Sequence, residues 1–247
     1  MIIYPDIELR RGQCVNLLRG RMEEPVVYDV DPVETAKNFQ AKGAEVLHVV
    51  DLDGAMQGGR HNAELIREII EAVDIPVQVG GGVRTIASVQ WWFDHGAHRV
   101  VLGTAAVKDR NLVRMACGSH PGKIVVSVDA RNGKVVIEGW REETTFTALD
   151  LAKSFEDSGV AEIIYTDIDL SDDQPGGTIA NTMRMGEQLA IPVIASGTIK
   201  TLDDVAILKY LPNIEGCVIG RALFNGKVDL ADAIKVAKEP YRAPTFV

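Results

Sequence analysis

Residues 51–85 read DLDGAMQGGRHNAELIREIIEAVDIPVQVGGGVRT, and residues 167–201 read DIDLSDDQPGGTIANTMRMGEQLAIPVIASGTIKT. The two stretches align without a gap at an offset of 116, and eight of the 35 positions are identical. The identical positions include the pairs Asp51/Asp167 and Gly81/Gly197 and the tripeptide IPV. Chance similarity between strand–helix units is the alternative explanation, but the ungapped length of the match favours a repeat. The repeat predicts a chain built from two related halves.

Short runs rich in Val and Ile recur along the whole chain, and the segments between them have the periodicity of helices. Capping signals open two of these segments, DPVE at 31–34 and TLDD at 201–204. Alternating strands and helices predict a parallel sheet, and eight such units without a linker favour a closed barrel over a doubly wound open sheet. We therefore predict an α/β protein: a single (β/α)8 TIM barrel domain over residues 1–247, with half-barrels at about 1–120 and 121–240. The eight predicted strands are IIYPDI (2–7), EVLHVVDL (45–52), IPVQVG (75–80), RVVLGT (99–104), KIVVSVDA (123–130), EIIYTDI (162–168), IPVIASG (191–197) and GCVIGRA (216–222).

The bulk composition is that of an ordinary globular protein, with 46% hydrophobic and 25% charged residues. A net charge of -9 argues against nucleic acid or an anionic membrane as a non-specific partner, because both attract excess Lys and Arg. A bound anion must therefore be held by local geometry. The sequence shows neither a signal peptide nor an apolar run of membrane-spanning length, so we expect a cytoplasmic protein. The three cysteines lie far apart and are expected to be small buried hydrophobes.

Glycines close four of the predicted strands, the third, fourth, seventh and eighth. Glycine lets the backbone approach a ligand closely, and free N–H groups at the start of a helix favour phosphate. Four such loops in symmetric positions predict two phosphate-binding sites on opposite sides of the barrel mouth. The alternative for any single loop is that glycine ends the strand for steric reasons alone. The candidate substrate- and phosphate-binding residues are Gly81, Gly82, Arg84, Gly103 and Thr104 in the first half, and Ser196, Gly197, Gly220 and Arg221 in the second.

Carboxylates close the other four strands, and two of them occupy equivalent positions. Glu8 begins ELRRG at 8–12, and Asp129 begins DARNG at 129–133. In a barrel with two related halves they should face each other across the mouth, where they can act as general base and general acid. Asp53 and Asp169, by contrast, are expected to be solvated or to cap helices.

The remaining residues with possible chemistry carry weaker signals. The five histidines show no metal-ligand spacing, so no metal is predicted. His48 is expected inside the barrel or at the helix interface, with a catalytic role as the alternative. Trp140 lies in the loop after the fifth predicted strand, where it could stack on a planar ring of the substrate or simply pack the loop. Trp91 and Trp92 fall inside the third helix and are expected to be core or interface residues.

The motifs together resemble the HisA family, the phosphoribosylformimino-5-aminoimidazole carboxamide ribotide (ProFAR) isomerases of histidine biosynthesis. The resemblance runs from residue 1 to about 235. It is carried by VVDLDGA (49–55), VGGGVRT (79–85), VLGTAAV (101–107), VDARNGKV (128–135), GW (139–140), YTDI (165–168) and IGRAL (219–223).

This resemblance implies an aldose–ketose isomerase that needs no metal or cofactor. We expect the chain to be a monomer. The implied reaction is an Amadori rearrangement of the N-linked phosphoribosyl group of a substrate with a phosphate at each end. The resemblance assigns Asp129 as the acid that helps to open the ribose ring and Glu8 as the base that moves a proton from C2. Thr166 would support the chemistry by hydrogen bonding, and Arg84 and Trp140 would hold the substrate.

The chain departs from the family pattern near the predicted catalytic centre. It reads D-I-E at 6–8 where the family reads A-I-D, and it has Asn16 where the family has Arg. The segment R-G-R at 19–21 replaces Q-G-D, and LSDDQPGGT at 170–178 replaces R-D-G-T. Two alternatives follow: a paralogue that acts on another phosphosugar such as phosphoribosylanthranilate, or a phosphosugar-binding protein with little turnover. Asp6 should lie on the same side of its strand as Glu8 but deeper, where it would need a partner.

Overall fold

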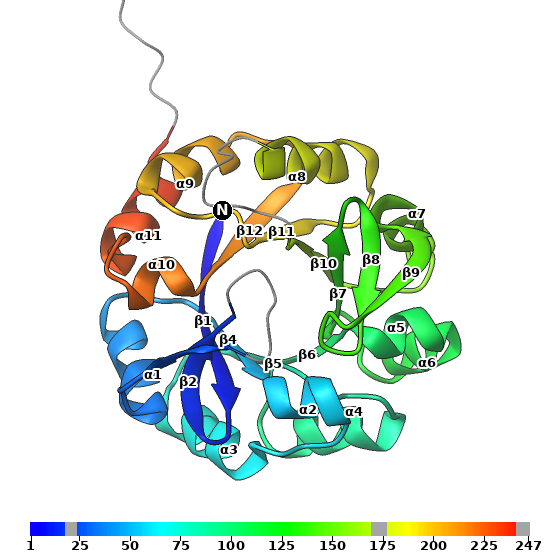
Figure 1. Cartoon of the computed structure of the whole chain (residues 1–247), viewed down its shortest axis with the longest axis horizontal. Helices are drawn as coiled ribbons and strands as arrows, with labels where there is room; N and C mark the ends of the chain where they lie inside the picture. Colours follow the sequence, from blue (N-terminus) through cyan, green and yellow to red (C-terminus); the bar gives the residue numbers. More distant parts are fainter. Residues whose placement is uncertain (18–23, 169–176, 241–247) are drawn as a thin grey trace, which may run out of the picture.

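The computed structural model describes residues 1–17, 24–168 and 177–240. Eight parallel strands form a closed barrel, because the pairing of β7 with β10 joins the two ends of the sheet. The β1 strand lies beside β12, so the first and last barrel strands are neighbours (Figure 1). All eight predicted strands are confirmed, and so is the TIM barrel. Their bounds are β1 Ile2–Arg10, β4 Leu47–Asp51, β5 Val77–Gly80, β6 Arg99–Leu102, β7 Ile124–Arg131, β10 Glu162–Asp167, β11 Val193–Ser196 and β12 Ile214–Ile219.

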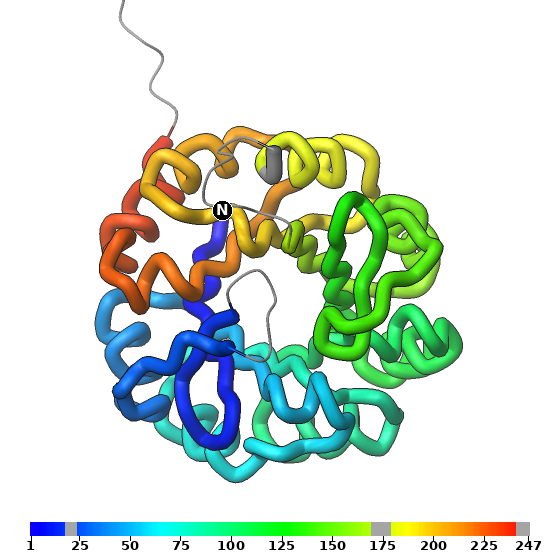
Figure 2. Tube along the Cα trace, in the orientation of Figure 1, coloured from blue at the N-terminus to red at the C-terminus, as the bar shows by residue number. Residues whose placement is uncertain are grey.

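Helices surround the barrel, and the chain runs once around the ring in sequence order (Figure 2). The two predicted capping signals are confirmed. Asp31 accepts the backbone N–H of Glu34 at the start of α1, and Thr201 and Asp204 form a capping box at the start of α9. The helices are α1 Pro32–Ala41, α2 Leu52–Gln57, α3 Ala63–Ala72, α4 Ile86–Asp94, α5 Thr104–Lys108, α6 Arg110–Ser119, α7 Ala148–Lys153, α8 Gly177–Gln188, α9 Leu202–Leu208, α10 Arg221–Phe224 and α11 Leu230–Lys238.

The core has two parts, as the alternation of side chains along a barrel strand requires. One strand face packs against the apolar stripes of the helices, for example against Ile66 and Ile69 of α3, which are fully buried. The other face fills the barrel interior. There Tyr4, Val46, Val101, Val125, Ile164, Ile194 and Val218 form one apolar cluster, which closes the barrel below the strand ends.

Two antiparallel hairpins, which the strand–helix rhythm did not predict, extend β1 and β7. Strands β2 (Gln13–Asn16) and β3 (Val26–Tyr28) follow β1, and β8 (Lys134–Ile137) and β9 (Glu142–Thr147) follow β7. Both turns have two left-handed central residues, with φ of 49° and 76° at Arg11 and Gly12 and of 49° and 74° at Asn132 and Gly133. Such pairs suit a tight two-residue hairpin. The predicted equivalence of ELRRG and DARNG therefore has a counterpart in backbone conformation.

Candidate active site

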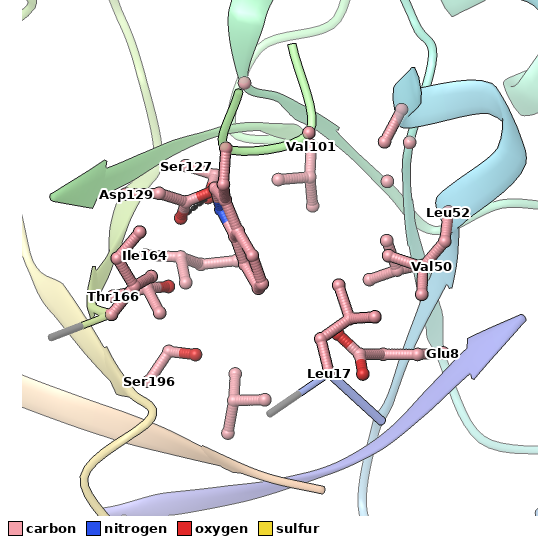
Figure 3. A pocket seen from close by; sticks show the side chains of 18 of the residues that line it. Glu8, Leu17, Val50, Leu52, Val101, Ser127, Asp129, Ile164, Thr166 and Ser196 are labelled. Atoms are coloured by element: carbon pink, nitrogen blue, oxygen red, sulfur yellow. Dashed lines mark hydrogen bonds between the residues drawn. The ribbon is translucent and has the colours of Figure 1, made fainter. Parts of the chain in front are cut away.

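A cavity of about 270 Å³ opens at the carboxyl ends of the barrel strands. Figure 3 shows Glu8 on one side of this space, with Asp129, Thr166 and Ser196 on the other. All thirteen residues that the sequence analysis proposed for the site line this one cavity: Glu8, Gly81, Gly82, Arg84, Gly103, Thr104, Asp129, Trp140, Thr166, Ser196, Gly197, Gly220 and Arg221.

Glu8 is held by the hairpin that follows its own strand. The Nδ2 atom of Asn16 on β2 donates to Oε2 of Glu8 over 3.0 Å, and the backbone of Leu17 hydrogen-bonds to the same carboxyl group. Burial raises the pKa of Glu8 to about 7, although these two bonds lower it in part; the nearby charge of Asp129 adds to the rise. Glu8 can therefore change its protonation state near neutral pH.

Asp129 is held by side chains from three elements. The Nε1–H group of Trp140 donates to Oδ2 over 2.7 Å, and the hydroxyl of Ser127 donates to Oδ1 over 2.8 Å. Thr166 adds a hydrogen bond from β10, on which it is the register partner of Asp129. Burial raises the pKa of Asp129, and the bonds from Trp140, Ser127 and Thr166 lower it in part. The hydrogen-bond donors around Asp129 therefore differ from those around Glu8.

The loop that carries Trp140 has an unusual backbone. Glu138, Gly139 and Trp140 are consecutive and all left-handed, with φ of 56°, 64° and 64°. The carboxylate of Glu138 bridges Arg84 at 2.7 Å and Lys108 at 2.6 Å, and the bond from Lys108 contributes most to its lowered pKa. The backbone N–H of Glu138 also donates to Oγ1 of Thr104. Two residues predicted to hold the substrate, Arg84 and Thr104, therefore also anchor the loop that places Trp140.

Two positions in the glycine-containing loops require glycine for steric reasons. Gly81 and Gly82 are left-handed, with φ of 96° and 72°, and a Cβ on either would approach backbone oxygens to 2.1 or 2.2 Å. Gly103 and Gly220 share another backbone conformation, with φ/ψ of −102°/−100° and −106°/−88°. The steric explanation thus holds at Gly81 and Gly82, while phosphate binding by these loops stays a prediction.

The Asp51 and Asp53 pair is structural. Asp51 is fully buried; it caps α2 by accepting the N–H of Gly54 and also accepts the Nδ2 group of Asn62. Asp53 accepts the backbone N–H of Arg11 in the first hairpin and the same amide of Asn62. The expectation that Asp53 is solvated is wrong, because these bonds fix it in a site that is 8% exposed. Asp169 lies outside the described residues.

The structure adds residues that the sequence analysis did not assign to the site. Asn16 was noted only as a departure from the family, and Ser127 was not noted, although it precedes Asp129 by two residues and so shares its face of the strand. His48 lies inside the barrel, as expected. Its Nδ1 atom is 2.9 Å from Nε2 of Gln78, and burial lowers its pKa to about 4. The departures at 19–21 lie outside the described residues, as does most of the segment 170–178.

Neither tryptophan of α4 lines the cavity. Trp92 is fully buried, and Trp91 stacks on His95, so both tryptophans of α4 have the core or interface roles expected of them. Across residues 1–17, 24–168 and 177–240, His, Cys, Asp and Glu nowhere gather in a group of three or more that could hold a metal ion. Within the same ranges, every helix is too short or too polar to cross a bilayer.

Comparison with known proteins gives a consistent picture. Residues 2–229 match the family model described as histidine biosynthesis protein. The chain is 47% identical over 240 residues to a protein from Syntrophus aciditrophicus, a match that covers 96% of this chain and 99% of the relative. It is 48% identical over 235 residues to a protein from Paracoccus denitrificans, covering 95% and 99%. Both relatives are named 1-(5-phosphoribosyl)-5-((5-phosphoribosylamino)methylideneamino)imidazole-4-carboxamide isomerases.

Proposed function

This chain belongs to the histidine biosynthesis protein family and is the aldose–ketose isomerase of that pathway, and we propose that Glu8 and Asp129 are its acid–base pair. The observation that carries the proposal is their placement. Both carboxyl groups line one cavity from opposite sides, and each is held by hydrogen-bond donors from neighbouring elements (Figure 3). This geometry leaves room for a substrate between a group that gives a proton and a group that takes one.

The substrate proposed for this chain is the one in its relatives' name, an imidazole carboxamide that carries two phosphoribosyl groups. One phosphate would lie on the loops of Gly81, Gly82, Gly103 and Thr104, and the other on the loops that start at Ser196 and Gly220. The support for this assignment is that the two sets of loops line the same cavity from different strands. No side-chain hydrogen bond caps the start of the helix after Gly103 or of the helix after Gly220, which suits an anion in an acidic protein.

The proposed reaction runs in two proton-transfer stages. Asp129 gives a proton to the ring oxygen of the aminoribose as the ring opens, which leaves a protonated imine at C1. Glu8 then removes the proton from C2, and the electron pair of that C–H bond forms the enolamine. Addition of a proton at C1 and loss of the proton from the C2 hydroxyl give the aminoketose. No atom is gained or lost overall, as an isomerisation requires.

Two hydrogen bonds fix the orientation of the Asp129 carboxyl group. The indole N–H of Trp140 can only donate, so it keeps Oδ2 as an acceptor. The hydroxyl of Ser127, which bonds to Oδ1, can either donate or accept. Both oxygens of Asp129 are therefore engaged by neighbouring side chains, and Trp140 orients the carboxyl group for proton transfer. Glu8, with a pKa of about 7, is available as a base at neutral pH.

The direct test is turnover of the bis-phosphorylated substrate by the purified protein and by Glu8→Gln and Asp129→Asn. Each substitution keeps the size of the side chain and removes its ability to exchange a proton, so kcat should fall by about 10²- to 10⁴-fold. Glu64→Gln on the exposed face of α3 is the matched control and should not change kcat. If folded Glu8→Gln or Asp129→Asn turned over normally, the acid–base assignment would be wrong.

The two alternatives make different predictions in the same assay. A paralogue would convert phosphoribosylanthranilate rather than the imidazole substrate, and a binding protein would bind the substrate without converting it. The comparisons favour neither, since the relatives at 45–48% identity share the isomerase name over nearly their full length.

A further inference from the structure

A second carboxyl group lies below Glu8, inside the barrel. Asp6 precedes Glu8 by two residues on β1, lines the same cavity and is 8% exposed. Its Oδ1 atom is buried without a hydrogen-bond partner among the described residues. An ionised Asp6 would have a buried oxygen without a hydrogen-bond donor, which costs free energy. A protonated Asp6 is neutral and can itself donate a hydrogen bond.

The side chain of Asn16 lies beside Asp6. Asn16 is 4% exposed, and its Nδ2 atom already donates to Glu8, while its Oδ1 atom is buried without a partner. Nδ2 of Asn16 and Oδ2 of Asp6 each lie 3.1 Å from the point that a Cβ on Gly220 would occupy. Asp6 and Asn16 therefore pack against the same spot at the end of β12. A buried amide oxygen such as Oδ1 of Asn16 is stable only with a donor, and Asp6 can supply one only when it is protonated.

Strand β7 has an O–H donor at the position that corresponds to Asp6. Ser127 precedes Asp129 by two residues, as Asp6 precedes Glu8, and its hydroxyl donates to Asp129 over 2.8 Å. A protonated carboxyl group resembles a serine hydroxyl in having a single O–H donor. Both strands thus place a potential O–H group one side chain below the carboxylate at the cavity.

We propose that Asp6 is a positioning residue for Glu8: as a neutral carboxylic acid it donates a hydrogen bond to Oδ1 of Asn16 and so holds the Asn16 amide against Glu8. This inference rests on the proposed role of Glu8 as the base. Asp6 does not touch the reacting atoms; it acts through Asn16.

The charges around Asp6 agree with this state. Burial raises the pKa of Asp6 well above its ordinary value, and the charge of Glu8 raises it further, so the surroundings favour the neutral form of Asp6. On β4, the register partner of Asp6 is His48, whose pKa burial lowers to about 4. On β2, burial raises the pKa of the Cys14 thiol to about 12. Gly220, which follows β12, presents only backbone. Among these neighbours, Glu8 alone changes charge near neutral pH.

The test compares Asp6→Asn, which keeps a donor without a charge, with Asp6→Leu, which has a similar size and no donor. We expect Asp6→Leu to lower kcat about ten- to a hundredfold with little change in KM, and Asp6→Asn to restore most of this loss. The pH midpoint of kcat/KM should stay near 7 in Asp6→Asn, because a neutral group replaces a neutral group. Asn16→Ala and Asp6→Leu should be non-additive in a double-mutant cycle, since they act as one unit.

Two results would overturn the proposal. Full activity of Asp6→Leu would show that Asp6 has no role, and an Asp6→Asn variant as slow as Asp6→Leu, with a shifted pH midpoint, would show that Asp6 works as an ion. Thermal unfolding separates these results from misfolding. Infrared difference spectra between the unmodified protein and Asp6→Asn at about pH 8 should contain the carbonyl band of a protonated carboxyl group; its absence contradicts the proposal even if Asp6→Leu fails to fold. If Glu8→Gln is fully active, the function proposed for Glu8 fails instead.

Discussion

Strands β1 and β7 each end in a carboxylate at the cavity and continue through the same left-handed turn into a hairpin, yet the two carboxylates have different neighbours. Asp129 receives hydrogen bonds from three side chains, one of them the indole of Trp140. Glu8 receives one from Asn16 and one from a backbone group, and a second carboxyl group lies below it. The comparison teaches that one scaffold can hold two carboxyl groups for opposite roles, because the side chains around each are free to differ.

The largest effect is expected when the lengths of the two acidic side chains are exchanged. Glu8→Asp and Asp129→Glu each move a carboxyl group by about 1 Å away from its donors, so kcat should fall about a hundredfold in both, with KM little changed. Steady-state kinetics measure the effect, and Glu187→Asp on the exposed face of α8 is the control for the loss of one methylene. A rise in kcat for Glu8→Asp would instead mean that the glutamate is a misplaced base.

A second prediction removes the donor that is unique to the β7 side. Trp140→Phe deletes the N–H group that donates to Asp129 and keeps the aromatic ring, so kcat should fall about tenfold. Loss of a donor to the ionised form raises the pKa of Asp129 further. The part of the pH–rate profile that reflects ionisation of Asp129 should therefore move to higher pH. The limb from Glu8 should stay near pH 7. Trp91→Phe on α4 is the control, and a shift of both limbs would contradict the separation of the two environments.

The third prediction concerns the β1 side alone. Because the base works without its proton, kcat/KM should rise with pH through about 7, the pKa of Glu8. Asn16→Ala removes a bond that stabilises the ionised form, so this midpoint should move to higher pH by up to about one unit. The rate should therefore fall by up to about fivefold at pH 7 and recover at higher pH. A uniform loss at every pH would indicate a defect in substrate binding rather than in the base.

The last prediction concerns stability and two asparagines that hydrogen-bond to buried aspartates. Asn62 donates to Asp51 and Asp53 and accepts the N–H of Gly12, whereas Asn181 donates to Asp167. Asn62→Ala should lower the free energy of unfolding by about 2–3 kcal/mol, and Asn181→Ala by about 1 kcal/mol. Urea unfolding monitored by circular dichroism measures both. Equal losses of unfolding free energy would show that Asn62 has no larger structural role than Asn181.

The sequence was sufficient for the barrel and for the list of residues at its mouth. Strand runs and the repeat depend on local periodicity, and the ends of barrel strands meet at one face whatever the side chains are. It was not sufficient for the hairpins, because β2 and β8 follow β1 and β7 directly and do not stand apart as strand–helix units. It also missed the donors of each carboxylate. Ser127 could have been found by counting two residues back from Asp129, but the bond from Trp140 depends on three consecutive left-handed residues that no pattern marks.

The barrel and the positions of Glu8 and Asp129 therefore follow from spacing along the chain, and the motifs of the chain resemble those of its family. Only the tertiary structure decided how the two groups differ. Their pKa values depend on burial and on donors from other elements, among them Asn16 on β2, Trp140 after β8 and Thr166 on β10. Interactions of this kind act over a few ångströms in space between residues far apart in the chain, so they exist only once the barrel has closed.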